Sequence, residues 1–308
     1  MKVVALAGGV GGAKLADGLS NLIEKGELTV IVNTGDDFTH FGLKICPDLD
    51  TICYTLAGIA NPETGWGRSC ESWKAMETIS KLGGPDWFQL GDLDLGLHLE
   101  RSRRIAQGAT LSQVTRQICE AFAVEDNVLP MSDEEIPTHL FTNEGELSFQ
   151  EYFVNRNCRP VVLDIQFIGR EQTNPAPGVI SSIQLADKVV FCPSNPWVSL
   201  DPILAVPGIR EAVRQKKEVV AVSPIIGGKT VKGPAAKMYL DRRIEPSAFA
   251  VANHFKEIIT GFVYDEVDFN LDEKIKGLGI ETLKTSILMN TQKDRIRLAT
   301  EVLNFTSV

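Results

Sequence analysis

The sequence predicts an α/β fold: a Rossmann-like, mostly parallel sheet with helices on both faces and a largely helical insertion. Residues 2–33 follow a strand, helix and strand pattern, which is the repeating unit of a parallel sheet. Helical patterns then follow one another over residues 49–122, and strands alternate with helices again after residue 178. We therefore expect a core made of residues 1–48 and 159–308, interrupted by an insertion at residues 49–158.

The opening unit consists of two short apolar runs with a helix between them. Residues 2–7 and 28–33 are bounded by turn-forming residues, as buried strands are. Residues 13–24 carry Leu15, Leu19 and Leu22 at helical spacing. Two parallel strands joined by one helix follow from this pattern.

The insertion is expected to contain four helices and a hairpin. Helical spacing covers residues 49–59, 71–82, 92–107 and 111–122. Thr110 and Gln113 form a capping box before the last of them. Asn143-Glu144-Gly145 separates two strand patterns, residues 139–142 and 146–152, and residues 160–168 predict another strand.

The second half of the chain predicts a return to alternating strands and helices. Expected strands are residues 188–192, 218–222, 261–264 and 280–285. Expected helices are residues 179–185, 202–215, 234–241, 247–259 and 292–305. The sheet therefore resumes after the insertion.

Composition excludes several classes of protein. The chain has 308 residues, of which 44% are hydrophobic, and its net charge is −9, so nothing attracts it as a whole to nucleic acid or anionic lipid. No apolar stretch approaches the ~20 residues that span a bilayer, and we expect a cytoplasmic protein without a membrane partner. Its six cysteines form no C-x-x-C pair, which favours free thiols. The sequence does not specify an oligomeric state, and a homodimer is expected from its frequency alone.

A glycine-rich segment at the first strand-to-helix turn is the first candidate site, with the sequence Gly8-Gly9-Val10-Gly11-Gly12-Ala13-Lys14. Glycines let backbone amides approach an anion at a helix start. The segment fits neither G-x-G-x-x-G nor G-x-x-x-x-G-K-[ST], because Lys14 and Ala13 stand where those patterns need glycine. We interpret it as a phosphate-binding turn of another kind. A tight turn that needs glycine only for close contact is the alternative.

A second glycine segment resembles a phosphate loop less well. In Ser223-Pro224-Ile225-Ile226-Gly227-Gly228-Lys229-Thr230, Ser223 replaces the first glycine of the phosphate-loop pattern and Pro224 stiffens the backbone. We do not interpret it as a phosphate loop. It follows a predicted strand, so it lies at the carboxyl edge of the sheet, where ligands bind in open α/β folds.

Four aspartates follow the second strand. Asp36 and Asp37 end Asn33-Thr34-Gly35-Asp36-Asp37, and Asp48 and Asp50 open a helix. Carboxylates this close to a phosphate site need a cation, which favours a magnesium site. Helix capping is an alternative for Asp48 or Asp50. For Asp36, the alternative is a hydrogen bond to a ribose hydroxyl, as in dinucleotide-binding folds.

Two further segments offer recognition groups. Between two prolines, Ser194 and Asn195 follow a predicted strand and could read a base edge or a phosphate; an Asx-type turn is the alternative. Aromatic and acidic residues gather in the insertion and could line a pocket for a planar substrate, although aromatics at helical spacing usually belong to a core. These residues are Trp66, Trp73, Trp87, Phe88, Asp92 and Asp94, with Gly91 directly before Asp92. The four histidines form no ligand pattern.

In order along the chain, over roughly residues 1–260, these segments resemble the 2-phospho-L-lactate transferases of coenzyme F-420 biosynthesis. The segments that carry the resemblance are the Gly8 to Lys14 run, Val32 to Asp37, Ile45 to Thr51, Trp66-Gly67, Leu90-Gly91-Asp92, Ala176-Pro177-Gly178, Pro193 to Pro196 and Ser223 to Lys229. The resemblance implies a magnesium-dependent transferase with two small-molecule substrates, a guanosine diphosphate-linked acid and the deazaflavin Fo. The terminal ribityl hydroxyl of Fo would attack the phosphorus that bears the acid, and GMP would leave. Val10 is similar to the bacterial branch, and the acid, lactyl or enolpyruvyl, stays open.

The resemblance also implies roles for individual residues. Asp50 and Asp36 would be catalytic, with Asp50 the first candidate to meet the Fo hydroxyl or the metal; Asp36, Asp37 and Asp50 would hold the metal, and the insertion would supply the Fo pocket. The implied substrate-binding residues are Gly8, Gly9, Val10, Gly11, Gly12, Lys14, Asp48, Thr51, Trp66, Gly91, Asp92, Ser194, Asn195, Pro196, Ser223, Gly228 and Lys229.

Two other functions remain compatible with parts of the sequence. A regulatory protein of the same superfamily could bind a nucleotide sugar or a dinucleotide without turnover, but it would have little use for Pro47-Asp48-Leu49-Asp50-Thr51 beside an aromatic insertion. A nicotinamide oxidoreductase could use Asp36 for the ribose, but Lys14 at the third glycine position counts against it.

Overall fold

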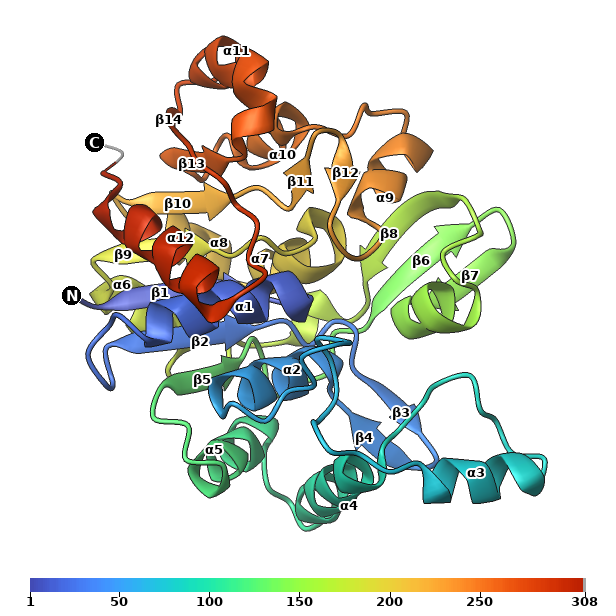
Figure 1. Cartoon of the computed structure of the whole chain (residues 1–308). Helices are drawn as coiled ribbons and strands as arrows, with labels where there is room; N and C mark the ends of the chain where they lie inside the picture. Colours follow the sequence, from blue (N-terminus) through green and yellow to red (C-terminus); the bar gives the residue numbers. More distant parts are fainter. Residues whose placement is uncertain (307–308) are drawn as a thin grey trace.

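A seven-stranded parallel sheet forms the centre of the structure, a computed structural model that describes residues 1–306 (Figure 1). The strand order is β14-β13-β10-β9-β1-β2-β5. The strands are β1 (Val3–Ala7), β2 (Leu28–Val32), β5 (Asn127–Pro130), β9 (Lys188–Phe191), β10 (Val219–Val222), β13 (Gly261–Tyr264) and β14 (Glu281–Lys284). The predicted α/β class with a parallel sheet is confirmed. The chain runs from β1 to β2 on one side and returns to β9 on the other, so the order reverses at β1.

Each face of the sheet has its own apolar core, as the alternating side chains of β1 illustrate. Val3 and Ala5 contribute to one cluster with helices α1 (Gly9–Ser20), α2 (Pro47–Leu56), α5 (Leu111–Ala121) and α12 (Gln292–Asn304). Val4 and Leu6 contribute to the other with helices α6 (Val179–Leu185), α7 (Asp201–Ala205), α8 (Ile209–Arg214), α10 (Ala248–Phe255) and α11 (Asp272–Lys276). Side chains of a strand alternate between faces, so helices cover both sides of the sheet.

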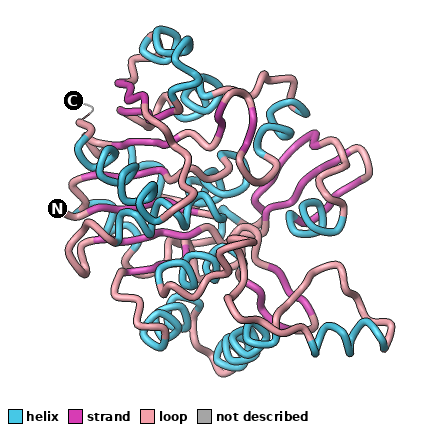
Figure 2. Tube along the Cα trace, in the orientation of Figure 1, coloured by secondary structure: helices cyan, strands magenta, loops and turns pink. Residues whose placement is uncertain are grey.

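Smaller sheets extend beyond the carboxyl ends of the central strands (Figures 1 and 2). One is an antiparallel sheet of order β7-β6-β8, and two are hairpins, β3 with β4 and β11 with β12. Their strands are β3 (Phe38–His40), β4 (Leu43–Ile45), β6 (Thr138–Thr142), β7 (Gly145–Ser148), β8 (Val162–Phe167), β11 (Ile225–Ile226) and β12 (Lys229–Thr230). The remaining helices and helical turns are α3 (Lys74–Lys81), α4 (Asp92–Ala106), η1 (Glu151–Asn155), η2 (Arg170–Gln172), η3 (Pro196–Leu200), α9 (Ala235–Asp241) and η4 (Glu266–Leu271).

Most predicted elements are present, and one predicted helix is wrong. The capping box of Thr110 and Gln113 is confirmed at the start of α5. Residues 202–215 do not form one helix, because α7 ends before Pro207 and Gly208, and Gly208 has a positive φ of 87°. Proline removes a backbone donor and glycine favours this left-handed conformation, so the chain turns and restarts as α8.

The central sheet also draws on residues that the sequence assigned to the insertion. Strand β5 pairs in parallel with β2, and helices α2 and α5 cover the same face as α1. The β3 and β4 hairpin was not expected from the sequence. The segments within 49–158 that lie outside the sheet core are therefore mainly α3, α4 and the β6 and β7 hairpin.

Two expectations about the chain as a whole can be compared with the structure. Among residues 1–306, no helix combines the length and apolarity needed to cross a membrane. The six cysteines are free, as predicted, although the Sγ atoms of Cys53 and Cys119 lie 3.6 Å apart between α2 and α5.

Candidate active site

Two of the four predicted aspartates meet on one asparagine at the carboxyl end of β2. The amide nitrogen of Asn33 donates to Asp36 Oδ1 at 3.0 Å and to Asp48 Oδ2 at 2.9 Å. The other oxygen of each acid also has a neutral donor: Gln150 Nε2 lies 3.0 Å from Asp36 Oδ2, and the backbone nitrogen of Gly9 lies 2.7 Å from Asp48 Oδ1. The acid pair therefore lies directly against the start of α1.

Burial makes this acid pair electrostatically unfavourable. Burial, followed by the charges of Asp48 and Asp37, raises the pKa of Asp36 well above its ordinary value. Burial also raises the pKa of Asp48 to about 6, although the hydrogen bonds from Asn33 and Gly9 oppose the shift. Two like charges this close need a cation or a proton.

The donor set of this pair fits a magnesium ion. Carboxylate oxygens are the ligands that Mg2+ prefers, and among the described residues the side-chain oxygens of Asp36 and Asp48 accept hydrogen bonds from neutral amides. Capping does not explain Asp48 or Asp50, because Cys46 is the N-cap residue of α2 and no side chain caps it. Of the four aspartates, Asp36 and Asp48 share one donor, whereas the metal ligands that the resemblance implied were Asp36, Asp37 and Asp50.

Asp50 points away from this pair and is held by an arginine of α4. Arg101 NH1 donates to Asp50 Oδ2 at 3.0 Å, and NH2 donates to Asp50 Oδ1. The Arg101 side chain is 2% exposed and that of Asp50 is 8% exposed. Burial works against the charged guanidinium, but the Asp50 carboxylate raises the pKa of Arg101. A direct contact of Asp50 with a metal or with the Fo hydroxyl would require this ion pair to open.

A second acid and a histidine complete the surroundings of Asp50. Asp94 Oδ1 accepts a hydrogen bond from the Tyr54 hydroxyl at 2.5 Å and lies 3.6 Å from His98 Nε2. Ligand atoms of Asp50, Asp94 and His98 all lie within 4.8 Å of one another, a spacing suitable for a metal. Arg101 already supplies the positive charge there, so we assign no ion to this cluster.

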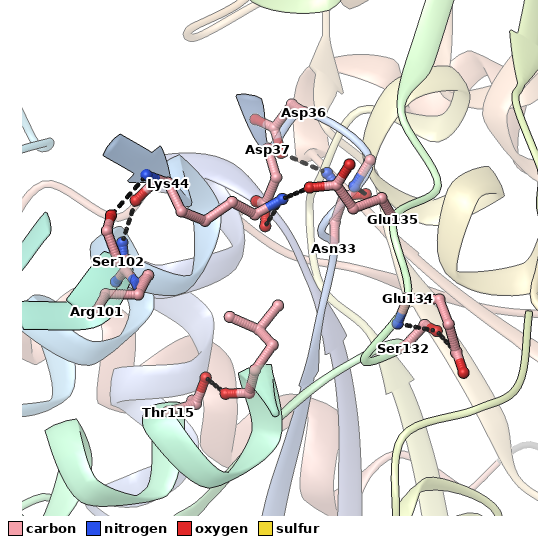
Figure 3. A network of polar contacts seen from close by, with 12 residues as sticks. Asn33, Asp36, Asp37, Lys44, Arg101, Ser102, Thr115, Ser132, Glu134 and Glu135 are labelled. Atoms are coloured by element: carbon pink, nitrogen blue, oxygen red, sulfur yellow. Dashed lines mark hydrogen bonds and ion pairs between the residues drawn. The ribbon is translucent and has the colours of Figure 1, made fainter. Parts of the chain in front are cut away.

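Asp37 lines a cavity that Asp36 does not line. Its carboxylate is buried, and Lys44 Nζ, 3.8 Å from Asp37 Oδ2, is also bound to Glu135 Oε1 at 2.7 Å (Figure 3). Neither oxygen of Asp37 has a hydrogen-bond partner within the described residues, and burial raises the pKa of Asp37 to about 7. Asp37, Thr34 and Lys44 line a cavity of about 260 Å³ together with residues of the α4 to α5 connection. Asp37 is thus a buried acid open to a cavity beside the acid pair.

The glycine turn is shaped by close contacts with neighbouring loops. Gly9 has a positive φ of 64°, a conformation that favours glycine. A Cβ atom on Gly11 would lie 2.4 Å from the carbonyl oxygen of Pro193, and one on Gly12 would lie 2.7 Å from Ser194 Oγ. One on Gly8 would lie 2.5 Å from Asp48 Oδ2. The close-contact explanation therefore accounts for these glycines, and an anion-binding role for the free amides of the turn is a separate prediction.

Two lysines lie close to each other near the start of α1. Lys14 Nζ donates to the carbonyl of Met289 at 2.7 Å, and burial together with the charges of Arg295 and Lys232 lowers the pKa of Lys14. Lys232 Nζ donates to the carbonyl of Thr64 at 2.7 Å. The adjacent Gly65 lies against Val10, because a Cβ on Gly65 would be 2.8 Å from Val10 Cγ1. The loop that carries Trp66 therefore covers the first turn of α1.

The Ser194 to Pro196 segment contacts the glycine turn through hydrogen bonds between Ser194 and Gly8. Ser194 Oγ donates to the carbonyl of Gly8 at 2.8 Å and accepts from its backbone nitrogen at 3.0 Å. Asn195 Oδ1 accepts from the backbone nitrogen of Trp197 at 3.0 Å, which is the Asx-type turn, and Pro196 opens η3. Both polar side chains are thus engaged within the protein.

The second glycine segment forms a hairpin tip. Gly227 and Gly228, with positive φ values of 55° and 78°, connect β11 to β12, and Lys229 is exposed. Ser223 is buried, and its hydroxyl donates to the carbonyl of Ile225 at 2.9 Å. The segment lies beyond the carboxyl end of β10, as predicted, and it is not a phosphate-wrapping loop.

The remaining predicted residues serve different parts of the insertion. Asp92 accepts hydrogen bonds from the Ser72 hydroxyl and the backbone nitrogen of Ala75, and the Ser72 contact lowers the pKa of Asp92. Gly91 is the N-cap residue of α4, and a Cβ there would overlap the Glu71 side chain. These contacts explain the Gly91-Asp92 pair as the junction of α3 and α4. Thr51 is buried in α2, and Trp66 is 47% exposed.

A second cavity lies under α9 and α10, and its lining begins at Trp197, the residue after Pro196. It measures about 500 Å³ and is lined by Trp197, Tyr239, Phe249 and His254 among others. None of the predicted site residues lines it. We therefore assign the chemistry of the site to the acid pair and the start of α1 rather than to this cavity.

Sequence reasoning missed the side chains that hold the aspartates. Asn33 lies in the segment that carries Asp36, but a neutral amide offers no chemical signal of its own. Gln150 and Arg101 come from the hairpin region and from α4, far from the aspartates in sequence. Arginines on helices are mostly exposed to solvent, so the sequence alone does not predict that Arg101 is buried.

Known proteins resemble this chain in sequence and in fold. The sequence profile described as 2-phospho-L-lactate transferase CofD matches residues 3–288. A phosphoenolpyruvate transferase of Streptomyces griseus is 41% identical over 310 residues, covering 98% of each chain, and one of Kitasatospora aureofaciens is 42% identical, covering 98% of this chain and 97% of the relative. A crystal structure of a UPF0052-family protein from Bacillus halodurans shares the fold, with a TM-score of 0.65 at 17% identity over 98% of both chains. The chain therefore belongs to the 2-phospho-L-lactate transferase CofD family and is an enzyme, a transferase.

Proposed function

We propose that this phosphotransferase of coenzyme F-420 biosynthesis moves a phosphoenolpyruvyl or phospholactyl group from a guanosine diphosphate-linked acid to the terminal ribityl hydroxyl of Fo. The observation that carries the proposal is the position of the Asp36 and Asp48 pair, which touches the start of α1 through Gly9. This point lies where the strand order reverses, at the carboxyl edge of the sheet. Open α/β sheets bind their ligands there.

The charges around the start of α1 suit a diphosphate and a metal ion. The acid pair contacts the turn through Gly9, and Lys14 and Lys232 are the nearby cationic side chains. Among the described side chains, none accepts a hydrogen bond from the backbone nitrogens of Val10 or Gly11, so these amides are free to bind phosphate oxygens. A phosphate group would thus meet amides and ammonium groups at the same turn.

Asp36 and Asp48 would hold magnesium, with Asp37 beside them. When bound, the ion would neutralise the negative charge of the diphosphate and of the leaving GMP. Asn33 and Gln150 would keep the two carboxylates in fixed orientations through their amides. Pre-oriented ligands of this kind lower the cost of ordering the site when substrate arrives.

The loop at Ser194 would fix the shape of the donor site rather than read the base by itself. Ser194 is bound to both backbone groups of Gly8, and Asn195 caps η3. The backbone of the Pro193 to Pro196 segment and the β11 and β12 hairpin with Lys229 are the groups left to meet the guanosine half. Fo would lie against the insertion, near the Asp37 cavity and the Trp66 loop.

The reaction needs one bond to form and one to break. The ribityl oxygen of Fo forms a bond to the phosphorus that bears the acid, the bond from that phosphorus to the bridging oxygen of GMP breaks, and the hydroxyl proton is released. The products are a phosphodiester and GMP. Catalysis then depends on positioning and charge neutralisation, and no covalent nucleophile of the protein is required.

The experiment compares the two donors directly. The purified protein is incubated with Fo, Mg2+ and either enolpyruvyl- or lactyl-diphosphoguanosine, and GMP and the phosphodiester are quantified by chromatography with mass detection. We expect equal amounts of GMP and phosphodiester, no reaction in EDTA, and the faster rate with the enolpyruvyl donor, because the curated relatives reported above are named phosphoenolpyruvate transferases.

A binding experiment gives the control. Thermal stabilisation is followed with GDP, Fo and NAD in separate samples, and GDP and Fo should each stabilise the protein. Stabilisation by NAD alone, without GMP release from either donor, would refute the proposal. Asp164→Asn, an exposed substitution on β8, serves as the matched variant for aspartate changes in the site.

A further inference from the structure

Helix α4 contacts Lys44 and Asp50, on either side of the start of α2, at four atoms. Ser102 Oγ accepts from the backbone nitrogen of Lys44 at 2.8 Å, and Arg101 NH1 lies 3.4 Å from the Lys44 carbonyl (Figure 3). Arg101 also donates to both carboxylate oxygens of Asp50. Lys44 precedes α2, and Asp50 lies in its first turns. One helix of the insertion therefore fixes both sides of the start of α2.

The start of α2 is also where Asp48 originates. Asp48 and Asp50 lie within the same turn of α2, one directed to Gly9 and Asn33 and the other to Arg101. A rotation or shift of this turn would move both carboxylates together. The orientation of Asp48 against Asp36 therefore depends on the hold that Arg101 has on Asp50.

Stability alone does not account for a pair of this kind. Removing two charges from water is costly, and a buried ion pair often contributes no more than apolar side chains of similar volume. Arginine differs from lysine in offering a planar fork that fixes the direction of a carboxylate. The geometry of the Arg101 and Asp50 pair is therefore its distinctive property.

We propose that Arg101 is a positioning residue of the transfer reaction, acting through Asp50 to hold the first turn of α2 so that Asp48 and Asp36 share one cation. The reaction itself rests on the proposed function, whereas the cation does not depend on which substrates are used. His98, whose Nδ1 lies 3.2 Å from Arg101 NH1, supports the guanidinium from the same helix.

The test uses Arg101→Lys, which keeps the charge and loses the fork, and Arg103→Lys as the matched control. Arg103 is an exposed residue of the same helix that pairs with Glu100. Mn2+ serves as the probe, and its binding is measured by electron paramagnetic resonance without substrates. We expect Arg101→Lys to weaken Mn2+ binding at least tenfold and to lower kcat at least tenfold, while KM for the guanosine donor changes less than twofold. Arg103→Lys should match the wild type in all three measurements.

A second variant keeps the test decisive in case Arg101→Lys folds poorly. Arg101→Gln with Asp50→Asn removes both charges of the ion pair together, and the melting temperature should stay near that of the wild type. Two neutral amides make fewer and weaker hydrogen bonds than the charged fork, so Mn2+ binding should remain weak. Recovery of both Mn2+ affinity and kcat to within twofold of wild type would show that the pair only stabilises the fold and would overturn the inference.

Failure of the inference is distinguishable from failure of the proposed function. If the wild type releases no GMP from either donor, the proposed function is wrong, and Mn2+ binding still tests Arg101. If the wild type turns over but Arg101→Lys binds Mn2+ as the wild type does, the inference is wrong and the function stands. A wild type that binds no Mn2+ overturns the inference as well.

Discussion

The side-chain amide of Asn33 lies 2.9 Å from Asp48 Oδ2, and the same nitrogen lies 3.0 Å from Asp36 Oδ1. One neutral donor thus serves two buried acids that come from different elements, the end of β2 and the start of α2. The Asn33 carbonyl oxygen accepts from the backbone nitrogen of Gly35 at 2.9 Å, which fixes the direction of the amide. This arrangement keeps the two carboxylates together while leaving their repulsion unbalanced.

Asn33→Asp should destabilise the metal-free protein and increase its response to magnesium. The change replaces the shared donor with a third buried carboxylate of the same shape, and it should cost about 1–3 kcal/mol in the free energy of unfolding. Thermal unfolding in EDTA and in saturating Mg2+ measures both quantities. The melting temperature should fall in EDTA and recover in part with Mg2+. Equal losses in both buffers would contradict a cation site at this pair.

Asp48→Asn should abolish most of the activity without unfolding the protein. The amide oxygen can still accept from Gly9, but one of the two charges that would bind the cation is lost. We expect turnover to fall roughly 100-fold or more and the Mg2+ concentration for half-maximal rate to rise. GMP release is the measurement, and Asp164→Asn should keep the wild-type rate. A variant of Asp48 with normal Mg2+ dependence would exclude this residue as a ligand.

Gly11→Ala and Gly96→Ala should change stability in opposite directions. A Cβ on Gly11 would lie 2.4 Å from the Pro193 carbonyl oxygen, so the Pro193 loop or α1 must move, at a cost of about 1–3 kcal/mol. Gly96 lies within α4 and has nothing within 4 Å of its Cβ position, so alanine should stabilise the helix by about 1 kcal/mol. Chemical denaturation measures both. Tolerance of Gly11→Ala would mean that the turn is looser than the structure indicates.

The metal-free protein should become less stable as the pH rises from about 5.5 to 8. Burial raises the pKa of Asp48 to about 6 and that of Asp37 to about 7, whereas the unfolded chain has ordinary aspartates. The native state therefore binds more protons than the unfolded state in this window, and the stability that protonation gives is lost as the pH passes through the native pKa values. Acids with lowered pKa values, such as Glu100 at about 2, titrate below the window.

Melting temperatures in EDTA across this window measure the effect. Asp37→Asn removes one titrating group, so the fall near pH 7 should be smaller in this variant than in the wild type. Saturating Mg2+ should also reduce the fall, because a bound cation offsets the charges of Asp36 and Asp48. The prediction fails if the melting temperature of the wild type rises across this window and Asp37→Asn follows the same curve.

Much of the sheet could be predicted because its signals are local. Strands β1 and β13 and helices α1 and α6 follow short apolar patterns bounded by glycine or polar turns. The β3 and β4 hairpin and strand β5 escaped prediction, since β3 and β4 have only three residues each and β5 ends in a proline. Such short segments become strands only through partners supplied by the tertiary structure.

The candidate site, like the sheet, could be predicted only in part. The sequence by itself determined that four aspartates and a glycine turn gather at the carboxyl ends of β1 and β2, because parallel strands end at one edge of a sheet. Only the tertiary structure decided that Asp36 and Asp48 share Asn33, that Asp37 lines a cavity that Asp36 does not line and that Asp50 is held by Arg101. The physical reason is that side-chain direction and the partners of a buried charge are set by elements distant in sequence, here α4 and the β7 region, and no local pattern encodes them.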